Sequence, residues 1–248
     1  NNFFNFENYC EVKIEDEFKL SKNTINNINY DIQANENSFI QHDIFQNFSN
    51  SNKLFLTSST NCEKKSSYNQ NTYNFSDGFV RNFHYANLNG EFAKASLKGC
   101  FFLREKNLCS IKTHINHNAE NCESNQTYRG LLNDFSKANY FSNTHVSDKA
   151  QKTEAYQLSK GILLSENCNF FSKPELRIFA DDVKCSHGST IGPVDGSAMF
   201  YLRSRGINKN QAMKMIISSF IEEDLKYLDV QNMNRILNHL SNYLDSIL

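Results

Sequence analysis

The sequence predicts a mainly β fold that ends in a small helical region. Before about residue 195, short segments alternate between apolar and polar residues, and no convincing helical periodicity is present. After that point, apolar residues recur at the i, i+3, i+4 spacing of an amphipathic helix. Many short strands of fairly even spacing are typical of a sandwich, a barrel or a β-solenoid, and the alternation leaves all three open because no strict repeat period emerges.

The clearest strand signals lie at residues 109–115 and 176–181, where every second residue is apolar or a threonine. Asn, Asp, Ser and Gly, which favour turns, separate these runs from their neighbours. Similar runs occur at Lys53–Ser58, Glu91–Leu97, Asn125–Leu132, Ala138–Val146, Glu154–Leu164 and Asn169–Phe170.

Three helices are expected after the strands. Asp195 is a candidate N-cap for a short helix that ends at Gly206, a residue suited to the left-handed conformation beyond a helix end. Asn208 with Gln211 three residues later resembles a capping box and opens a longer helix. The apolar stripes of the second and third helices are Met213, Ile216, Ile217, Phe220, Ile221, Leu225 and Leu228, and Met233, Ile236, Leu237, Leu240, Leu244 and Ile247.

The bulk properties disfavour several kinds of partner. The formal net charge is −1 and the basic residues are scattered, so no basic stripe predicts binding to nucleic acid. No apolar run approaches the ~20 residues that a membrane-spanning helix needs, and the N-terminus has no signal-peptide pattern. We therefore expect a soluble protein with neither nucleic acid nor membrane as its partner.

Cysteine usage indicates a reducing compartment. The seven cysteines are widely spaced, odd in number and contain no C-x-x-C pair, which argues against a disulfide framework and against a zinc ribbon. His114, His117 and Cys122 form one candidate metal cluster, but on a strand the two histidines point to opposite faces, which is poor zinc spacing.

The most informative segment is ADDVKCSHG at residues 180–188. On an extended strand, Cys185 and His187 project from one face with Cα atoms roughly 6.5 Å apart, whereas Lys184 and Ser186 face the other way. A thiol and an imidazole on one face can hold a borderline or soft metal, or a sulfur species, with further ligands supplied from elsewhere.

No self-contained enzyme signature is present. The sequence lacks the P-loop, G-x-S-x-G, H-E-x-x-H and G-x-G-x-x-G motifs, so we expect no nucleotide hydrolysis by this chain. Asp181 and Asp182 are adjacent and would face opposite ways on a strand, so they do not form an acid/base pair and are better suited to a turn.

ADDVKCSHG, followed by a Gly-bearing turn and FYLRSRGI at residues 200–207, resembles the C-terminal core signature of the SufB/SufD family of iron–sulfur cluster assembly proteins. The resemblance is to the SufD branch, since the SufB branch shares the second segment but lacks the Lys-Cys-Ser-His run. It is clear over residues 109–228. It implies a right-handed parallel β-helix over residues 1–194 and a C-terminal helical subdomain over residues 195–248.

The resemblance also implies a function. Proteins of this type are non-catalytic scaffold subunits of a SufBCD-like complex, in which an iron–sulfur cluster is held transiently between SufB and SufD subunits. By transfer, His187 and Cys185 are the candidate interface and metal-binding residues. The helical subdomain would dock a SufC-like ATPase, and whether a flavin binds stays open. The residues of this chain that match the second segment and are expected at the ATPase contact are Phe200, Tyr201, Arg203, Arg205 and Gly206.

Other interpretations are kept open. A β-solenoid carbohydrate-active enzyme would use Asp181 or Asp182, a thiol enzyme would use Cys185 activated by His187, and a structural solenoid would need none of them. Arg203 and Arg205 are suited to pairing with carboxylates of a partner or of residues 222–224. The resemblance implies a bacterial cytoplasmic location or, alternatively, a plastid or apicoplast stroma. Because the first residue is not Met, we expect a fragment or a processed form.

Overall fold

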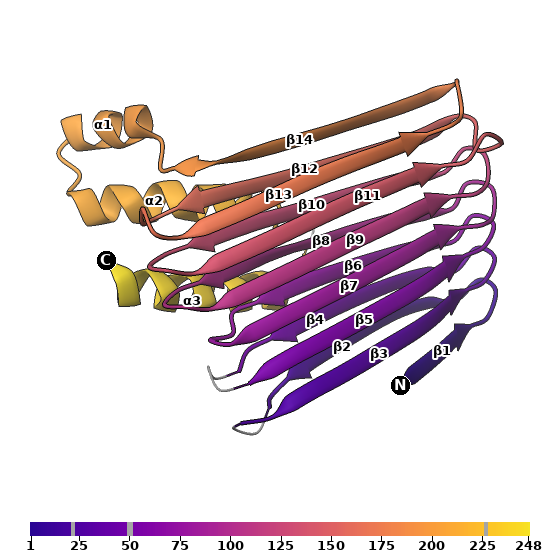
Figure 1. Ribbon diagram of the computed structural model, residues 1–248, viewed down its shortest axis with the longest axis horizontal. Coiled ribbons are helices and arrows are strands. Elements are labelled where there is room, and N and C mark those ends of the chain that lie inside the picture. Colours follow the sequence, from indigo (N-terminus) through magenta and orange to yellow (C-terminus); the bar gives the residue numbers. More distant parts are fainter. Residues whose placement is uncertain (21–22, 49–51, 226–227) are drawn as a thin grey trace.

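The computed structural model describes residues 1–20, 23–48, 52–225 and 228–248. Two parallel sheets of seven strands face each other, and the chain passes from one sheet to the other with each strand (Figure 1). This is a parallel β-solenoid of about six turns, so the predicted fold class is confirmed. Sheet A consists of β1 (Asn2–Phe6), β3 (Ile25–Ala34), β5 (Lys53–Cys62), β7 (Phe79–Leu88), β9 (Leu108–His117), β11 (Lys137–Val146) and β13 (Asn169–Ile178). Sheet B consists of β2 (Glu11–Phe18), β4 (Phe39–Gln46), β6 (Ser67–Asn74), β8 (Lys94–Leu103), β10 (Glu123–Leu132), β12 (Thr153–Leu163) and β14 (Val183–Pro193).

The turns of the solenoid differ in length. Lys53 pairs with Phe79, which makes that turn 26 residues long, whereas Lys137 pairs with Asn169, 32 residues further on. The differences are taken up at the corners, and the strands stay in register. A strict period is therefore absent from the sequence although the structure repeats.

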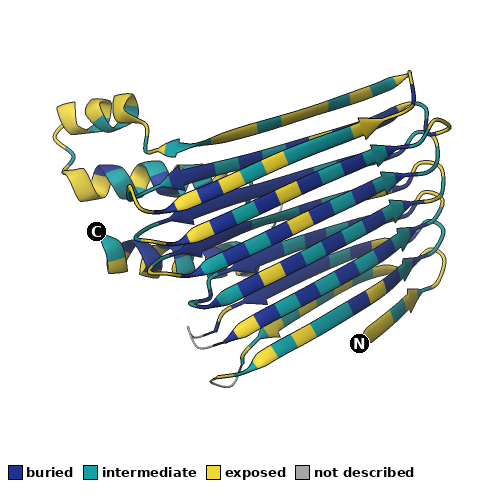
Figure 2. Ribbon diagram, in the orientation of Figure 1, coloured by how far each residue is buried: buried dark blue, intermediate teal, exposed yellow. Residues whose placement is uncertain are grey.

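Alternation along each strand divides it into an inward and an outward face (Figure 2). The apolar positions of the run at residues 109–115 are all buried and point between the sheets. Apolar side chains from both sheets form one continuous core along the solenoid. The strand signal in this run is confirmed, because its period of two matches the buried face.

Several strands escape sequence analysis because their inward residues are polar. In β6 the inward side chains include Gln70 and Thr72, which are buried in a hydrogen-bonded network with His84 on β7. The Nδ1 atom of His84 accepts from Gln70 at 2.7 Å and lies 2.8 Å from Ser58 Oγ. A polar interior of this kind removes the apolar alternation that marks a strand.

The buried histidines predict a pH-dependent stability. Burial, with a smaller effect of His42, lowers the pKa of His84 to about 3, and burial lowers that of His117 to about 4. As the pH falls, the histidines of the unfolded state take up protons before those of the folded state. The folded state therefore has its full stability above pH 6.5 and loses it as the pH falls towards 4. The free energy of unfolding falls by up to about 1.4 kcal/mol per pH unit for each histidine. Denaturant unfolding between pH 4.5 and 7.5 should show this slope. In a His84→Gln variant, the slope of the free energy of unfolding against pH should be smaller by the contribution of one histidine. An unchanged slope would show that His84 does not cause this pH dependence.

The corners use backbone conformations that the sequence pattern does not show. Nine described residues other than glycine have a positive φ, among them Asn37, Lys65, Phe92 and Asn121, which occupy equivalent corners of successive turns. Their N–H groups donate to the carbonyl oxygens of the next corner. The predicted strand at Glu91–Leu97 therefore starts too early: Phe92 forms the corner, and β8 begins at Lys94.

In the described residues, three helices follow the last strand: α1 (Gly196–Ser204), α2 (Lys209–Glu222) and α3 (Val230–Ile247). The side chain of Asp195 caps α1, that of Asn208 accepts from the Gln211 N–H, and Gly206 has a φ of +85°, as predicted. The apolar stripes of α2 and α3 pack on outward residues of sheet B, so the helices run back along this sheet. The second helix is shorter than predicted, because α2 ends at Glu222, and Leu225 and Leu228 of its predicted stripe pack from the segment that follows. No helix in the described ranges combines the length and apolarity that a membrane crossing requires.

Candidate functional site: the edge strand and the first helix

The last strand of sheet B carries the predicted site. In the described part of the chain, β14 pairs only with β12, so the backbone groups on its other side face away from the sheet (Figure 1). Cys185 lies opposite Ala155 and His187 opposite Gln157. Both side chains belong to the inward-facing set, but no further turn of the described chain covers this end of the solenoid, and Figure 2 shows β14 largely exposed.

Cys185 and His187 differ in burial. Cys185 is half-buried and packs against the small apolar cluster of Val146, Ala150 and Ala180. Burial raises the pKa of the Cys185 thiol, and a backbone hydrogen bond from Ala155 opposes this only in part. His187 is exposed. The direction of this pKa shift is opposite to the lowered thiol pKa of an activated nucleophilic cysteine.

The neighbours of this pair lie as the strand pattern predicts. Lys184 points to the outer face, where its ammonium group is 2.7 Å from Glu154. Asp181 and Asp182 are exposed in the turn between β13 and β14. Among the described residues, no group of three or more His, Cys, Asp or Glu side chains is placed to hold a metal ion.

The second candidate cluster is dispersed. His114 points outward from β9 and contacts Asn116 at 2.7 Å, whereas His117 points inward and contacts Ser124 at 2.8 Å. Cys122 is buried at a corner, where its thiol donates to the Gly90 carbonyl oxygen. The prediction that the two histidines occupy opposite faces is confirmed.

The residues predicted to contact an ATPase lie on and just after α1. None of the residues of α1 is buried, and Phe200 and Tyr201 expose 75% and 55% of their surface. Arg205 lies over the Tyr201 ring at 4.9 Å, and Arg203 is also exposed. Two large aromatic side chains and two cations are therefore presented to solvent on a helix that packs against α2.

A buried arginine that sequence analysis missed fixes α2 to the solenoid. Arg129 on β10 is 2% exposed, donates to Asp224 and Glu223, and also donates to the Phe220 carbonyl oxygen at 2.9 Å. Burial lowers the pKa of Arg129, but the bonds to both carboxylates outweigh this and raise it. Glu223 and Asp224 thus pair with Arg129, and in the described residues not with Arg203 or Arg205. The only signal in the sequence is an arginine at an outward position of a strand followed by Gly-Leu-Leu.

The fold is thus a parallel β-solenoid with helices packed on one sheet, and its last edge strand carries a cysteine and an exposed histidine. Residues 2–220 match the family model described as "SUF system FeS cluster assembly, SufBD core domain". The chain belongs to this SufB/SufD family of the SUF system, and its relatives support the SufD branch.

Three relatives illustrate the similarity. The iron-sulfur cluster assembly protein SufD of Escherichia coli is 36% identical over 136 residues, which are 55% of this chain and 32% of that protein. A SufBD family protein of Synechocystis is 29% identical over 208 residues (84% and 46%), and the chloroplastic protein ABCI7 of Arabidopsis thaliana is 38% identical over 103 residues (41% and 22%). The chain therefore spans less than half the length of each of these relatives.

Proposed function

We propose that this protein is a scaffold subunit of a SufBCD-like complex that assembles iron–sulfur clusters. In this proposal a SufB-like subunit pairs along β14, and a SufC-like ATPase docks on the C-terminal helices, which act as a subdomain distinct from the β-helix. The observation that carries the proposal is the open edge of β14 with Cys185 and His187 beside it. Family membership supports the assignment to cluster assembly.

The two edge strands at this end differ in their capacity to pair with another chain. β13 carries Pro174 in its middle, and proline has no N–H to donate to a neighbouring strand. β14 is eleven residues long and has a proline only at its last position, Pro193. A long edge strand without such protection is a template for strand addition, so we assign the partner to β14.

The cluster enters this proposal as the cargo of the complex. A neutral imidazole nitrogen of His187 ligates iron, and the Cys185 thiol does so once the metal displaces its proton. Two ligands on one strand leave coordination positions open, which the partner subunit fills. The chain contributes position and ligands and no chemical step of its own, and any flavin stays outside the proposal.

The exposed surface of α1 supports the ATPase contact. Aromatic residues and arginine are enriched at protein interfaces, and Phe200, Tyr201, Arg203 and Arg205 supply both kinds together, with Gly206 ending the helix. ATP-driven motion of the docked ATPase would then be transmitted through α2 to the solenoid. The setting we propose is a bacterial cytoplasm or a plastid-type stroma, since relatives include bacterial and chloroplastic proteins.

Loss of the imidazole tests the proposal. We expect His187→Ala, co-expressed with SufB-like and SufC-like partners, to reduce cluster formation by about tenfold or more. In metal sites generally, loss of even a group that orients a ligand lowers metal affinity by about 10- to 100-fold. The readout is iron and acid-labile sulfide per purified complex. Ser186→Ala, on the opposite face of the same strand, is the matched control and should assemble clusters normally. If His187→Ala assembled as much cluster as the wild type, His187 would have no role in assembly. If neither an ATPase nor a second β-helix protein co-purified with the chain, a stand-alone structural solenoid would be favoured.

A further inference from the structure

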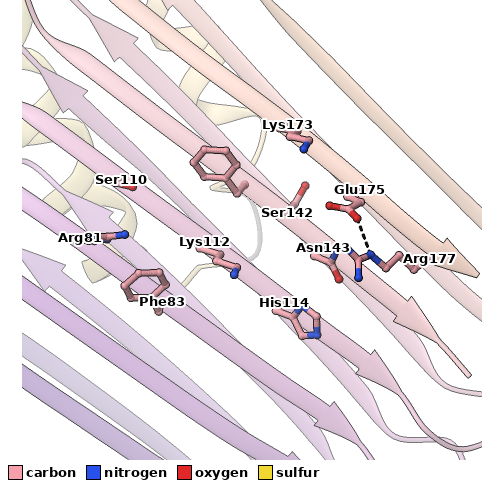
Figure 3. A pocket seen from close by; sticks show the side chains of 11 residues that line it. Arg81, Phe83, Ser110, Lys112, His114, Ser142, Asn143, Lys173, Glu175 and Arg177 are labelled. Carbon is pink, nitrogen blue, oxygen red and sulfur yellow. Dashed lines mark hydrogen bonds and ion pairs between the residues drawn. The ribbon is translucent and has the colours of Figure 1, made fainter.

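A groove of about 470 Å³ lies on the outer face of sheet A, on the side of the solenoid away from the helices. It crosses β7, β9, β11 and β13. Figure 3 shows Arg81 and Phe83 at one side, Lys112 in the middle and Lys173 at the other side. The volume lies within the range of small-molecule sites.

Rings and cations alternate across the groove. In the strand register Lys112 lies between Phe83 and Phe141, and Phe141 lies between Lys112 and Lys173. Neighbouring strands are about 4.8 Å apart, so a lysine residue flanks Phe141 on each side in the sheet. The Arg81 guanidinium already covers the Phe83 ring at 4.9 Å. Phe141, which is 38% exposed, is therefore the ring on which a planar ligand would stack.

The groove carries excess positive charge on a chain whose net charge is −1. Of its four Lys and Arg side chains, only Arg177 forms an ion pair among the described residues, with Glu175 at 2.6 Å. Within the described ranges, no carboxylate lies within ion-pair distance of Arg81, Lys112 or Lys173. On sheet B, by contrast, the outward residues Lys94 and Lys184 pair with Glu123 and Glu154. Lys173 makes no ion-pair contact with Glu175, although its charge contributes to lowering the pKa of that carboxyl group. Four cations and a single carboxylate in one hollow favour an anionic ligand.

The surroundings favour a small organic anion over a peptide. The backbone groups of β7, β9 and β11 are all used by neighbouring strands, so an extended peptide could not add to this face. A planar ring can stack on Phe141, and a phosphate group on that ring can be bound by Lys112 and Lys173, which lie on the two neighbouring strands. We propose that this groove binds an organic phosphate that carries a planar ring and has the size of a mononucleotide. Binding requires no hydrolysis, in keeping with the missing P-loop.

Adenosine 5′-diphosphate, adenosine and inorganic pyrophosphate serve as probes in calorimetric titration of the full chain. We expect the diphosphate to bind at least tenfold more tightly than either of the other two. Phe141→Leu should weaken its binding about 5- to 150-fold, the range of base–aromatic stacking, while leaving pyrophosphate binding unchanged. Lys112→Gln should weaken the binding of both adenosine 5′-diphosphate and pyrophosphate. Lys137→Gln, on the same strand as Phe141 but outside the groove, is the control and should bind like the wild type.

Each alternative result is decisive. The proposal would be overturned if adenosine 5′-diphosphate did not bind. It would also be overturned if pyrophosphate bound with the same affinity as the diphosphate and Phe141→Leu changed neither. An oligothymidylate that binds tenfold more tightly than the diphosphate would also overturn it and point to single-stranded nucleic acid. Thermal unfolding of the same samples checks folding, since Phe141 and Lys112 are both outward residues. If Phe141→Leu unfolds, Lys112→Gln carries the test alone.

Discussion

Replacement of Gly99 by alanine is expected to destabilise the protein by about 3 kcal/mol, the upper end of the cost of overpacking a core. Gly99 lies on β8 between Thr72 and Tyr128 of the neighbouring strands. A Cβ atom at this position would be 2.1 Å from the Thr72 carbonyl oxygen and 2.8 Å from the Tyr128 ring. Tyr128 is fully buried and packs on Tyr140 at 4.8 Å, so the ring has no room to retreat.

A second glycine provides the matched control. Gly188 lies on the edge strand β14, and the nearest atom to a Cβ there is Leu158 Cδ1, at an ordinary contact distance of 3.4 Å. Gly188→Ala should change the free energy of unfolding by less than about 1 kcal/mol, because alanine also reduces the entropy of the unfolded chain. Urea unfolding of both variants at pH 7.5 measures the difference. Equal midpoints would show that β6 and β8 separate easily at Gly99.

The second large effect is expected at the contact between α2 and sheet B. Neutralising Glu223 and Asp224 together, as Glu223→Gln with Asp224→Asn, should destabilise the helical region by about 3–5 kcal/mol, because it leaves the charge of Arg129 buried and uncompensated. The carboxylates themselves are 55% and 32% exposed, whereas Arg129 is 2% exposed. Loss of the arginine should therefore be the milder change, since water can solvate the carboxylates left behind.

The difference between losing the two carboxylates and losing the arginine tests whether this contact depends on a buried charge. Arg129→Met keeps much of the side-chain volume and should lower the free energy of unfolding by about 1–2 kcal/mol. Adding Glu223→Gln and Asp224→Asn to this variant should lower it only a little further, because no buried charge remains. Glu222→Gln, an exposed neighbour outside these ion pairs, should have no measurable effect. Hydrogen exchange of the α2 amides together with urea unfolding reports both local and global stability. A larger loss in Arg129→Met than in the carboxylate pair would contradict a buried, charge-dependent contact.

The same contact links stability to the proposed function. α1 packs on α2, and α2 is held on sheet B both by its apolar stripe and by Arg129, so the position of the exposed aromatic and basic residues of α1 depends in part on this arginine. In the proposed complex, a variant that loosens α2 would impair ATPase docking without altering β14. Variants at His187 would do the reverse, so the two parts of the proposal are separable.

Much of the architecture followed from local pattern. The alternation at residues 109–115 identified a buried strand face, and the caps at Asp195 and Asn208 located two helix starts, because these signals depend on residues close together in the chain. Strand ends were poorly predicted. The run starting at Lys53 extends to Cys62, and strands with polar interiors such as β6 gave no signal, because buried Gln and Thr are satisfied by partners on other turns.

Local sequence pattern was enough to predict a succession of short strands followed by helices, and to place Cys185 and His187 on one strand face. The position of this face at an open end, the burial of Arg129 beneath α2, and the groove lined by Phe83, Lys112, Phe141 and Lys173 became visible only in the folded chain. In the solenoid, residues in contact across neighbouring strands are 26 to 32 positions apart, and corners of varying length hide that spacing from any local pattern.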